Sequence, residues 1–255
     1  MPATASSAPS KALLGAARAL SRALAGLRFA PPVAHVYDPL QYAWAPYEAY
    51  IERYASKRKR VVLLGMNPGP FGMMQTGVPF GEVAAVRDWM GIRAPVVRPP
   101  SEHGARPIDG FDCARSEVSG RRLWGWAALR FGSASDFFRD WFVLNYCPLV
   151  FLETSGRNLT PDKLPAAERQ AVVQACDRHL AAALAALQPE WAIGIGGFAA
   201  RRLHAVLESG AVEPALARRI RIGQILHPSP ASPAANRGWD EAVDRELAAL
   251  GVPLG

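Results

Sequence analysis

Residues 61–72 read VVLLGMNPGPFG, an apolar run that ends at a glycine and continues into a loop rich in proline and glycine. Four consecutive valine and leucine residues are typical of a strand buried on both faces, as in a parallel sheet. Proline fixes φ and removes N–H donors, while glycine permits backbone conformations closed to other residues. We therefore expect a rigid loop that lets a ligand approach its backbone at the carboxyl end of a buried strand.

Three later stretches resemble this strand, and each follows a helix-like or irregular segment. They span residues 142–150, 191–197 and 221–227. Helical patterns lie between and around them, at residues 13–27, 47–54, 165–187, 198–208 and 239–250. This alternation predicts an α/β protein, with a three-layer α/β/α fold around a central, mostly parallel four-stranded sheet.

The length of 255 residues, half of them apolar, suits one α/β domain. We expect a single domain over residues 11–255, a disordered tail over residues 1–10, and a long functional or mobile connection over residues 91–112. The first 37 residues contain no acidic residue, as in a transit peptide, but a helix explains their leucine spacing equally well. No apolar run approaches the about 18 residues of a spanning helix, so we expect no membrane association.

Charge and cysteine content narrow the function classes. Lys and Arg total 29 against 22 acidic residues, and the net charge of +7 favours a polyanionic partner. An arginine-rich solvated surface explains the same charge about equally well. Cys113, Cys147 and Cys176 form no C-x-x-C pair, which excludes a disulfide scaffold and a four-cysteine metal site. We expect an intracellular protein, cytoplasmic in a bacterium or nuclear in a eukaryote.

A second unusual loop follows the last predicted strand. Residues 227–239 read HPSPASPAANRGW, so His227 begins a stiff, proline-rich projection. A lone histidine is more often a hydrogen-bonded structural residue than a catalyst. Neither loop contains the phosphate-binding pattern G-x-x-x-x-G-K-[ST].

Four motifs together resemble the single-strand-selective monofunctional uracil-DNA glycosylases. They are GMNPGPFGMMQTGVPFGEV (65–83), NYCPLVFL (145–152), SGRNLTP (155–161) and HPSP…NRGW (227–239), and the likeness extends over about residues 20–250. The resemblance implies the α/β/α fold of the uracil-DNA glycosylase superfamily. It also implies hydrolytic removal of uracil, and of 5-substituted uracils such as 5-hydroxymethyluracil, from DNA without lyase activity, metal or organic cofactor.

The resemblance also implies roles for two catalytic residues. Asn67 resembles the residue that positions the attacking water, and His227 resembles the one that stabilises the departing base. This reaction develops positive charge on the sugar and negative charge on the base, so a neutral amide that holds water suffices. The loop contains no lysine, which argues against Schiff-base lyase chemistry.

Five further residues are expected to contact the base. Phe80 resembles the ring that stacks on the flipped base, Asn145 the amide that reads its edge, and Gly69 the small residue that leaves space beside carbon 5. We also expect Met66 and Phe71 to line the substrate site. Taken without the motifs, Phe80 fits a core residue and Asn145 fits the cap of a strand end.

The projection is expected to bind DNA and to fill the space that the flipped base vacates. The DNA-binding candidates are Pro228, Ser229, Pro230, Asn236 and Arg237. Ala231 stands where the family can have a larger basic residue, which favours single-stranded over duplex DNA.

Alternative functions remain at this stage. The sequence is also compatible with a superfamily relative that prefers another base, such as mismatched thymine or deaminated purines. It is compatible as well with a DNA-binding module that lacks catalysis. A dehydrogenase is disfavoured because no G-x-G-x-x-G follows a plausible first strand. We expect a monomer that acts on single- and double-stranded DNA; the preferred lesion stays open.

Overall fold

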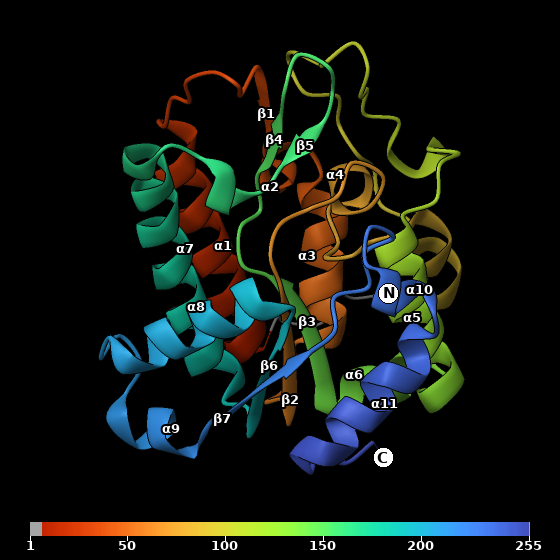
Figure 1. Cartoon of the computed structure of the whole chain (residues 1–255), viewed down its shortest axis with the longest axis vertical. Coiled ribbons are helices and arrows are strands. Elements are labelled where there is room, and N and C mark those ends of the chain that lie inside the picture. Colours follow the sequence, from red (N-terminus) through yellow and green to blue (C-terminus); the bar gives the residue numbers. More distant parts are fainter. Residues whose placement is uncertain (1–6, 255) are drawn as a thin grey trace.

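The computed structural model describes residues 7–254 and contains the expected central sheet (Figure 1). The strands β2 (Val61–Gly65), β3 (Trp141–Asn145), β6 (Trp191–Ile195) and β7 (Arg221–Ile225) pair in parallel, in the order β3-β2-β6-β7. Every residue of β2, β3 and β6 is buried, whereas the edge strand β7 has exposed positions. The predicted four-stranded parallel sheet is confirmed.

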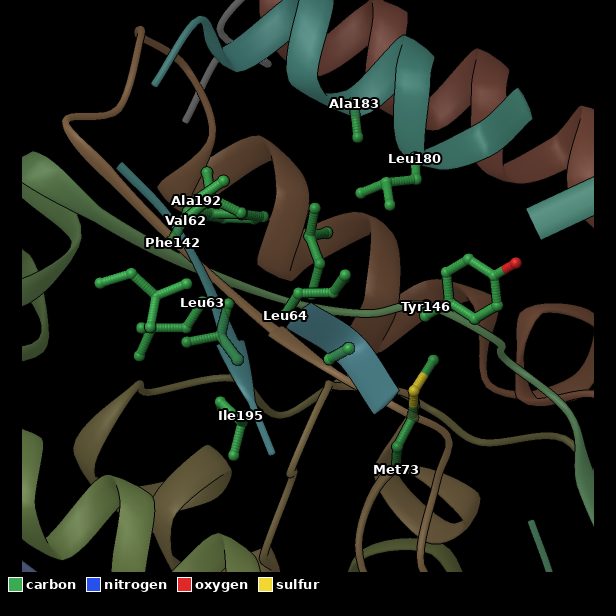
Figure 2. Packing of buried hydrophobic residues seen from close by; sticks show 14 of the residues in the cluster. Val62, Leu63, Leu64, Met73, Phe142, Tyr146, Leu180, Ala183, Ala192 and Ile195 are labelled. Atoms are coloured by element: carbon green, nitrogen blue, oxygen red, sulfur yellow. The ribbon is translucent and has the colours of Figure 1, made fainter. Parts of the chain in front are cut away.

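Helices cover both faces of this sheet, which completes the predicted three-layer fold. The helices α1 (Ala8–Ala25), α7 (Ala166–Leu187) and α8 (Gly197–Glu208) lie on one side, and α5 (Val118–Phe131), α6 (Ala134–Asp140) and α11 (Trp239–Leu250) lie on the other (Figure 1). Figure 2 shows Leu180 and Ala183 of α7 pointing toward the strands. Such burial of apolar surface is the dominant favourable contribution to folding.

Helix α3 (Trp44–Tyr54) is anchored to the sheet by a buried tyrosine. The Tyr50 ring stacks on Phe142 at a centroid distance of 5.0 Å, and its hydroxyl donates a 2.9 Å hydrogen bond to the Val143 carbonyl. A buried phenol needs such a partner, because an unpaired hydroxyl in the core is costly. The helix predicted from the spacing of residues 47–54 is confirmed.

A second, smaller sheet was not predicted. The strands β1 (His35–Tyr37), β4 (Val150–Leu152) and β5 (Asn158–Leu159) form an antiparallel sheet in the order β1-β4-β5, beyond one end of the main sheet (Figure 1). The prediction of one strand over 142–150 is therefore wrong. Two more hydrogen bonds follow β3, from the Tyr146 and Cys147 N–H groups to Gly65 and Met66, and Pro148 then has no N–H to continue the ladder.

Short elements complete the described chain. They are α2 (Pro39–Tyr42), α4 (Met73–Thr76), a π-helical turn (Ala85–Trp89), 3-10 turns (Gly110–Asp112 and Pro161–Lys163), α9 (Pro214–Arg219) and α10 (Pro233–Asn236). Residues 93–109 form the expected long connection, with no helix or strand apart from an isolated bridge between His103 and Arg106. Within residues 7–254 no helix is both long and apolar enough to cross a membrane.

Helix α1 begins earlier than the sequence suggested. Ser7 caps its N-terminus by accepting a hydrogen bond from the Ser10 N–H, and Ser10 itself is buried. The predicted disordered tail over residues 1–10 is therefore wrong for residues 8–10, while residues 1–6 lie outside the described residues. The apolar face from Leu13 to Leu24 is buried, as its helical spacing predicted.

Candidate active site

A cavity of about 350 Å³ opens where the loops after β2, β3 and β7 meet. The residues that line it are Met66, Asn67, Pro68, Gly69, Gly72, Met73, Phe80, Glu117, Ser119, Asn145, Asn158, Thr160, His227 and Ser229. Both catalytic candidates are among them, as are four of the five predicted substrate contacts. The carboxyl ends of parallel strands thus converge on one site, as expected for an open α/β sheet.

Gly65 allows a ring and an amide to meet at the end of β2. A β-carbon placed there would lie 2.4 Å from both the Cε2 atom of Phe80 and the Oδ1 atom of Asn145. Both distances are shorter than a van der Waals contact, so only glycine, which has no β-carbon, permits this arrangement. One wall of the cavity therefore combines an aromatic face with a polar amide.

Phe80 has a strained backbone, with a φ of 53°. A non-glycine residue in the left-handed region costs free energy and persists only where its surroundings enforce it. The Phe80 carbonyl accepts hydrogen bonds from the Trp124 indole N–H at 2.9 Å and from the Glu82 N–H at 2.7 Å. These contacts hold the Phe80 ring at the cavity.

The Asn145 amide has spare hydrogen-bonding capacity. Its Nδ2 lies 3.3 Å from the Met73 sulfur, a weak acceptor, and its buried Oδ1 has no hydrogen-bond partner within residues 7–254. A buried acceptor without a partner destabilises the fold by about 1 to 3 kcal/mol. Such a group is suited to a ligand that brings an N–H donor.

Asn67 and His227 present a neutral amide and a neutral imidazole. The Asn67 Nδ2 donates to the Leu149 carbonyl at 3.3 Å, which fixes the amide and leaves its oxygen available as an acceptor. Burial lowers the pKa of the His227 imidazole below its usual value, so this ring is uncharged at neutral pH. Its centroid lies 6.4 Å from that of Phe80.

Seven residues of the cavity were not predicted from the sequence: Pro68, Gly72, Met73, Glu117, Ser119, Asn158 and Thr160. Asn158 and Thr160 fall within the quoted motif 155–161, which was the available signal. The Asn158 Nδ2 donates to the Pro68 carbonyl at 3.0 Å and so secures the proline-glycine loop. Glu117 and Ser119 belong to the start of α5, where no sequence signal placed them at the site.

Gly69 lines the cavity and lies beside a carboxyl group. A β-carbon there would lie 2.2 Å from the Oε2 atom of Glu117, so a carboxyl group already occupies that side of the glycine. Burial raises the pKa of this carboxyl above its usual value.

The projection after β7 is held by an arginine of α5. The Arg122 guanidinium donates to the carbonyls of Pro228 at 3.0 Å and Ser229 at 3.3 Å, and to the Asn236 Oδ1 at 2.8 Å. The Asn236 Nδ2 donates in turn to the Pro230 carbonyl at 2.9 Å. These internal contacts make the projection rigid.

Four of the predicted DNA contacts lie outside the cavity, namely Pro228, Pro230, Asn236 and Arg237. Arg237 is exposed, whereas Pro228 is buried. Phe71 is also outside the cavity, and its ring lies under the Arg115 guanidinium at 4.1 Å. The roles of these five residues toward DNA or substrate stay predictions.

Among the described residues no cluster of three or more His, Cys, Asp or Glu side chains could hold a metal.

The chain is similar in sequence to known DNA glycosylases. Residues 52–247 match the uracil DNA glycosylase superfamily. The single-strand selective monofunctional uracil DNA glycosylase of Mus musculus is 46% identical over 233 residues, which cover 91% of this chain and 81% of that protein. The chain belongs to this family. The glycosylase of the same name from Bos taurus is 45% identical, covering 91% of this chain and 84% of its own length.

The fold of this uracil-DNA glycosylase family member also occurs in a solved structure of low sequence identity. The crystal structure of SMUG2 from Pedobacter heparinus matches with a TM-score of 0.62 at 17% identity, covering 92% of this chain and 97% of that one. The segment that matches the superfamily contains every residue that lines the cavity. The predicted family and fold are confirmed.

Proposed function

We propose that this protein is a monofunctional DNA glycosylase that removes uracil, and 5-substituted uracils such as 5-hydroxymethyluracil, and leaves an abasic site. The observation that carries the proposal is the cavity in which Asn67, Asn145, His227 and Phe80 meet at the ends of parallel strands. Its volume of about 350 Å³ suits one flipped pyrimidine rather than a larger cofactor.

Base selection follows from hydrogen-bond polarity. Uracil presents a donor at N3 and an acceptor at O4, and the Asn145 amide complements both, with its unpaired Oδ1 facing N3–H. Cytosine presents the opposite polarity and would leave unpaired groups, at a cost of about 1 to 3 kcal/mol each. Stacking on Phe80 adds about 1 to 3 kcal/mol without regard to sequence.

Hydrolysis then needs charge stabilisation rather than a strong base. The bond between N1 and C1′ breaks with its electron pair going to the base, and the oxygen of a water held by Asn67 bonds to C1′. The proton that this water loses is taken up by the departing base anion, so the products are neutral uracil and an abasic site. The His227 imidazole donates a hydrogen bond to O2, where negative charge develops. The neutral state of His227 suits this role, because it adds a donor without a buried positive charge.

The rigid projection after β7 supports access to the base. Held by Arg122, it enters the space that the flipped nucleotide vacates, with Arg237 near the phosphates. Extrusion costs less from a single strand than from a paired duplex, and Ala231 offers little bulk to stabilise an open duplex. We therefore propose that a monomer acts inside the cell on single-stranded and duplex DNA, with preference for single strands.

The test uses purified protein and a single-stranded oligonucleotide with one uracil, followed by alkaline cleavage of abasic sites. We expect cleavage with the wild type, and a loss of excision by about 100-fold or more in Asn67→Ala and His227→Ala with DNA binding largely kept. His204→Ala, which alters an exposed histidine of α8, is the matched control. Near-normal turnover in either cavity variant would contradict the assigned roles.

A further inference from the structure

Two arginines lie on one aromatic ring beside the cavity. The ring belongs to Phe71, which does not line the cavity itself but stands between Gly69 and Gly72, which both do. The Arg115 Cζ atom lies 4.1 Å from the centroid of this ring, and the Arg106 Cζ atom lies 5.4 Å from it. A guanidinium over an aromatic face is held there by cation–π attraction. Phe71 therefore restrains two positive charges at the rim of the cavity.

The long connection over residues 93–109 is anchored so that Arg106 reaches this ring. The buried Gln75 amide donates to the Pro70 carbonyl at 3.2 Å and to the Pro107 carbonyl at 3.0 Å. These two bonds join the residue that precedes the ring to the residue that follows the arginine. The fold therefore sets the position of Arg106 in advance, which lowers the entropic cost of binding a ligand there.

Both arginines adjoin segments that form the cavity wall. The Arg106 Nε atom donates a 3.0 Å hydrogen bond to the carbonyl of Gly156, which lies in the turn between β4 and β5. Gly156 comes two residues before Asn158, and Arg115 comes two residues before Glu117, and both of these later residues line the cavity. A nucleotide whose base enters the cavity therefore brings its backbone close to these two guanidinium groups.

No acidic residue neutralises the two charges. Within residues 7–254 neither Arg106 nor Arg115 forms a salt bridge, and Arg115 is exposed. Two guanidinium groups on one ring repel each other, and an anion that binds to both relieves this repulsion. Arginine stays charged at all ordinary pH values and donates two parallel hydrogen bonds to a phosphate group. The arrangement suits the phosphodiester backbone of a nucleic acid.

Resting on the proposed function, we propose that Arg106 and Arg115 bind the phosphates next to the flipped nucleotide, in the strand that carries uracil. Phosphate contacts fix the position and orientation of a strand but do not read its sequence. This phosphate site is formed by the 93–109 connection, the segment before α5 and the loop after β2, and so it is distinct from the projection after β7. The strand is then held at two places while its base occupies the cavity.

The experiment measures the Kd of a single-stranded oligonucleotide that carries one 2′-fluoro-2′-deoxyuridine, over a range of salt concentrations. The fluorine disfavours positive charge on the sugar, so the base is not excised during the measurement. Each phosphate contact to a single strand contributes about 0.7 to the slope of log Kd against log salt concentration. We expect Arg106→Gln and Arg115→Gln each to lower this slope by about 0.7 and to raise Kd by about fivefold.

Arg219→Gln is the matched control. It removes the same charge from an exposed residue at the end of α9, just before the amino end of β7, and we expect it to leave the slope unchanged. A second series of oligonucleotides replaces one phosphate at a time near the modified nucleotide by a neutral methylphosphonate. At a phosphate that Arg115 contacts, this replacement weakens binding by the wild type but not by Arg115→Gln, because the contact is already lost.

Unchanged slopes in both cavity-rim variants overturn the proposal, as does an equal fall in Arg219→Gln or the absence of any phosphate position that depends on either arginine. Thermal unfolding shows whether Arg106→Gln loosens the connection, and the exposed Arg115 keeps the test valid in that case. Release of uracil from an unmodified oligonucleotide is measured in parallel. If the wild type releases uracil but the slopes do not change, only the phosphate site fails. If the slopes change but no uracil is released, the proposed function fails and the phosphate site stands.

Discussion

The carbonyl oxygen of Phe80 accepts a 2.9 Å hydrogen bond from the indole nitrogen of Trp124. This bond crosses from α5 to the loop that carries the cavity's aromatic wall. A phenylalanine with a φ of 53° has lower-energy backbone conformations available, and each of them would move its ring. The indole thus stabilises the one conformation in which the ring lies beside Asn145.

Replacing Trp124 by phenylalanine tests this relationship. Trp124→Phe keeps an aromatic ring in the core but removes the N–H donor, so the Phe80 backbone loses a restraint. We expect kcat/KM for uracil excision to fall by about tenfold and the free energy of unfolding to fall by about 1 to 3 kcal/mol. Single-turnover excision and urea unfolding measure these effects.

Trp89→Phe is the matched control, because the Trp89 indole donates to the Gly132 carbonyl at 2.9 Å, away from the cavity. If Trp124→Phe reduces uracil excision no more than Trp89→Phe does, the restraint on Phe80 has no functional effect.

Gly65→Ala tests whether uracil excision requires the Phe80 ring and the Asn145 amide to lie close together. The added β-carbon would lie 2.4 Å from Phe80 and from Asn145, so at least one must move. We expect uracil excision to fall by about 100-fold, more than the stability loss accounts for. Gly125→Ala, at a helical position where a β-carbon meets nothing within 4 Å, is the control and should keep full activity. Equal activity of the two variants would refute the requirement.

Arg122→Ala should loosen the projection after β7. The guanidinium contacts Pro228, Ser229 and Asn236, and each bond to a charged donor contributes about 1.5 to 3 kcal/mol to the ordered conformation. We expect KM for a uracil-containing oligonucleotide to rise by about tenfold, because the projection must be ordered anew on binding. Arg121→Ala removes the same charge from an exposed neighbour that contacts Ser116, which separates rigidity from overall charge. If both variants have a similar KM, the rise in KM comes from the lost positive charge and not from a less rigid projection.

The sequence predicts the main sheet from local patterns, and both catalytic candidates come from the resemblance of its motifs to a known family. Residues 61–64 are all apolar, which indicates a strand buried on both faces. The Pro-Gly loop and His227 each follow a strand, and the carboxyl ends of these strands meet at one edge of the sheet. The second sheet was missed because β5 is a two-residue strand whose pairing depends on tertiary contacts. Glu117 was missed for a related reason, since only the approach of α5 to Gly69 brings it to the cavity.

His179 predicts a dependence of folding stability on pH. This residue of α7 is buried, its Nε2 has no hydrogen-bond partner among the described residues, and burial lowers its pKa from 6.5 to about 4. The unfolded chain therefore takes up a proton near pH 6.5, whereas the folded protein does so only near pH 4. Stability falls as the pH decreases through this window, by about 2 kcal/mol between pH 7 and pH 5 for this one group.

His179→Leu should remove that part of the acid sensitivity. Urea unfolding at pH 7 and pH 5 gives the change in the free energy of unfolding for each protein, and we expect the change to be about 2 kcal/mol smaller in the variant. His204→Leu, which replaces an exposed histidine of α8, serves as the control. The assignment fails if His179→Leu and the wild type lose the same stability over this range, since the imidazole would then bind its proton equally well folded and unfolded.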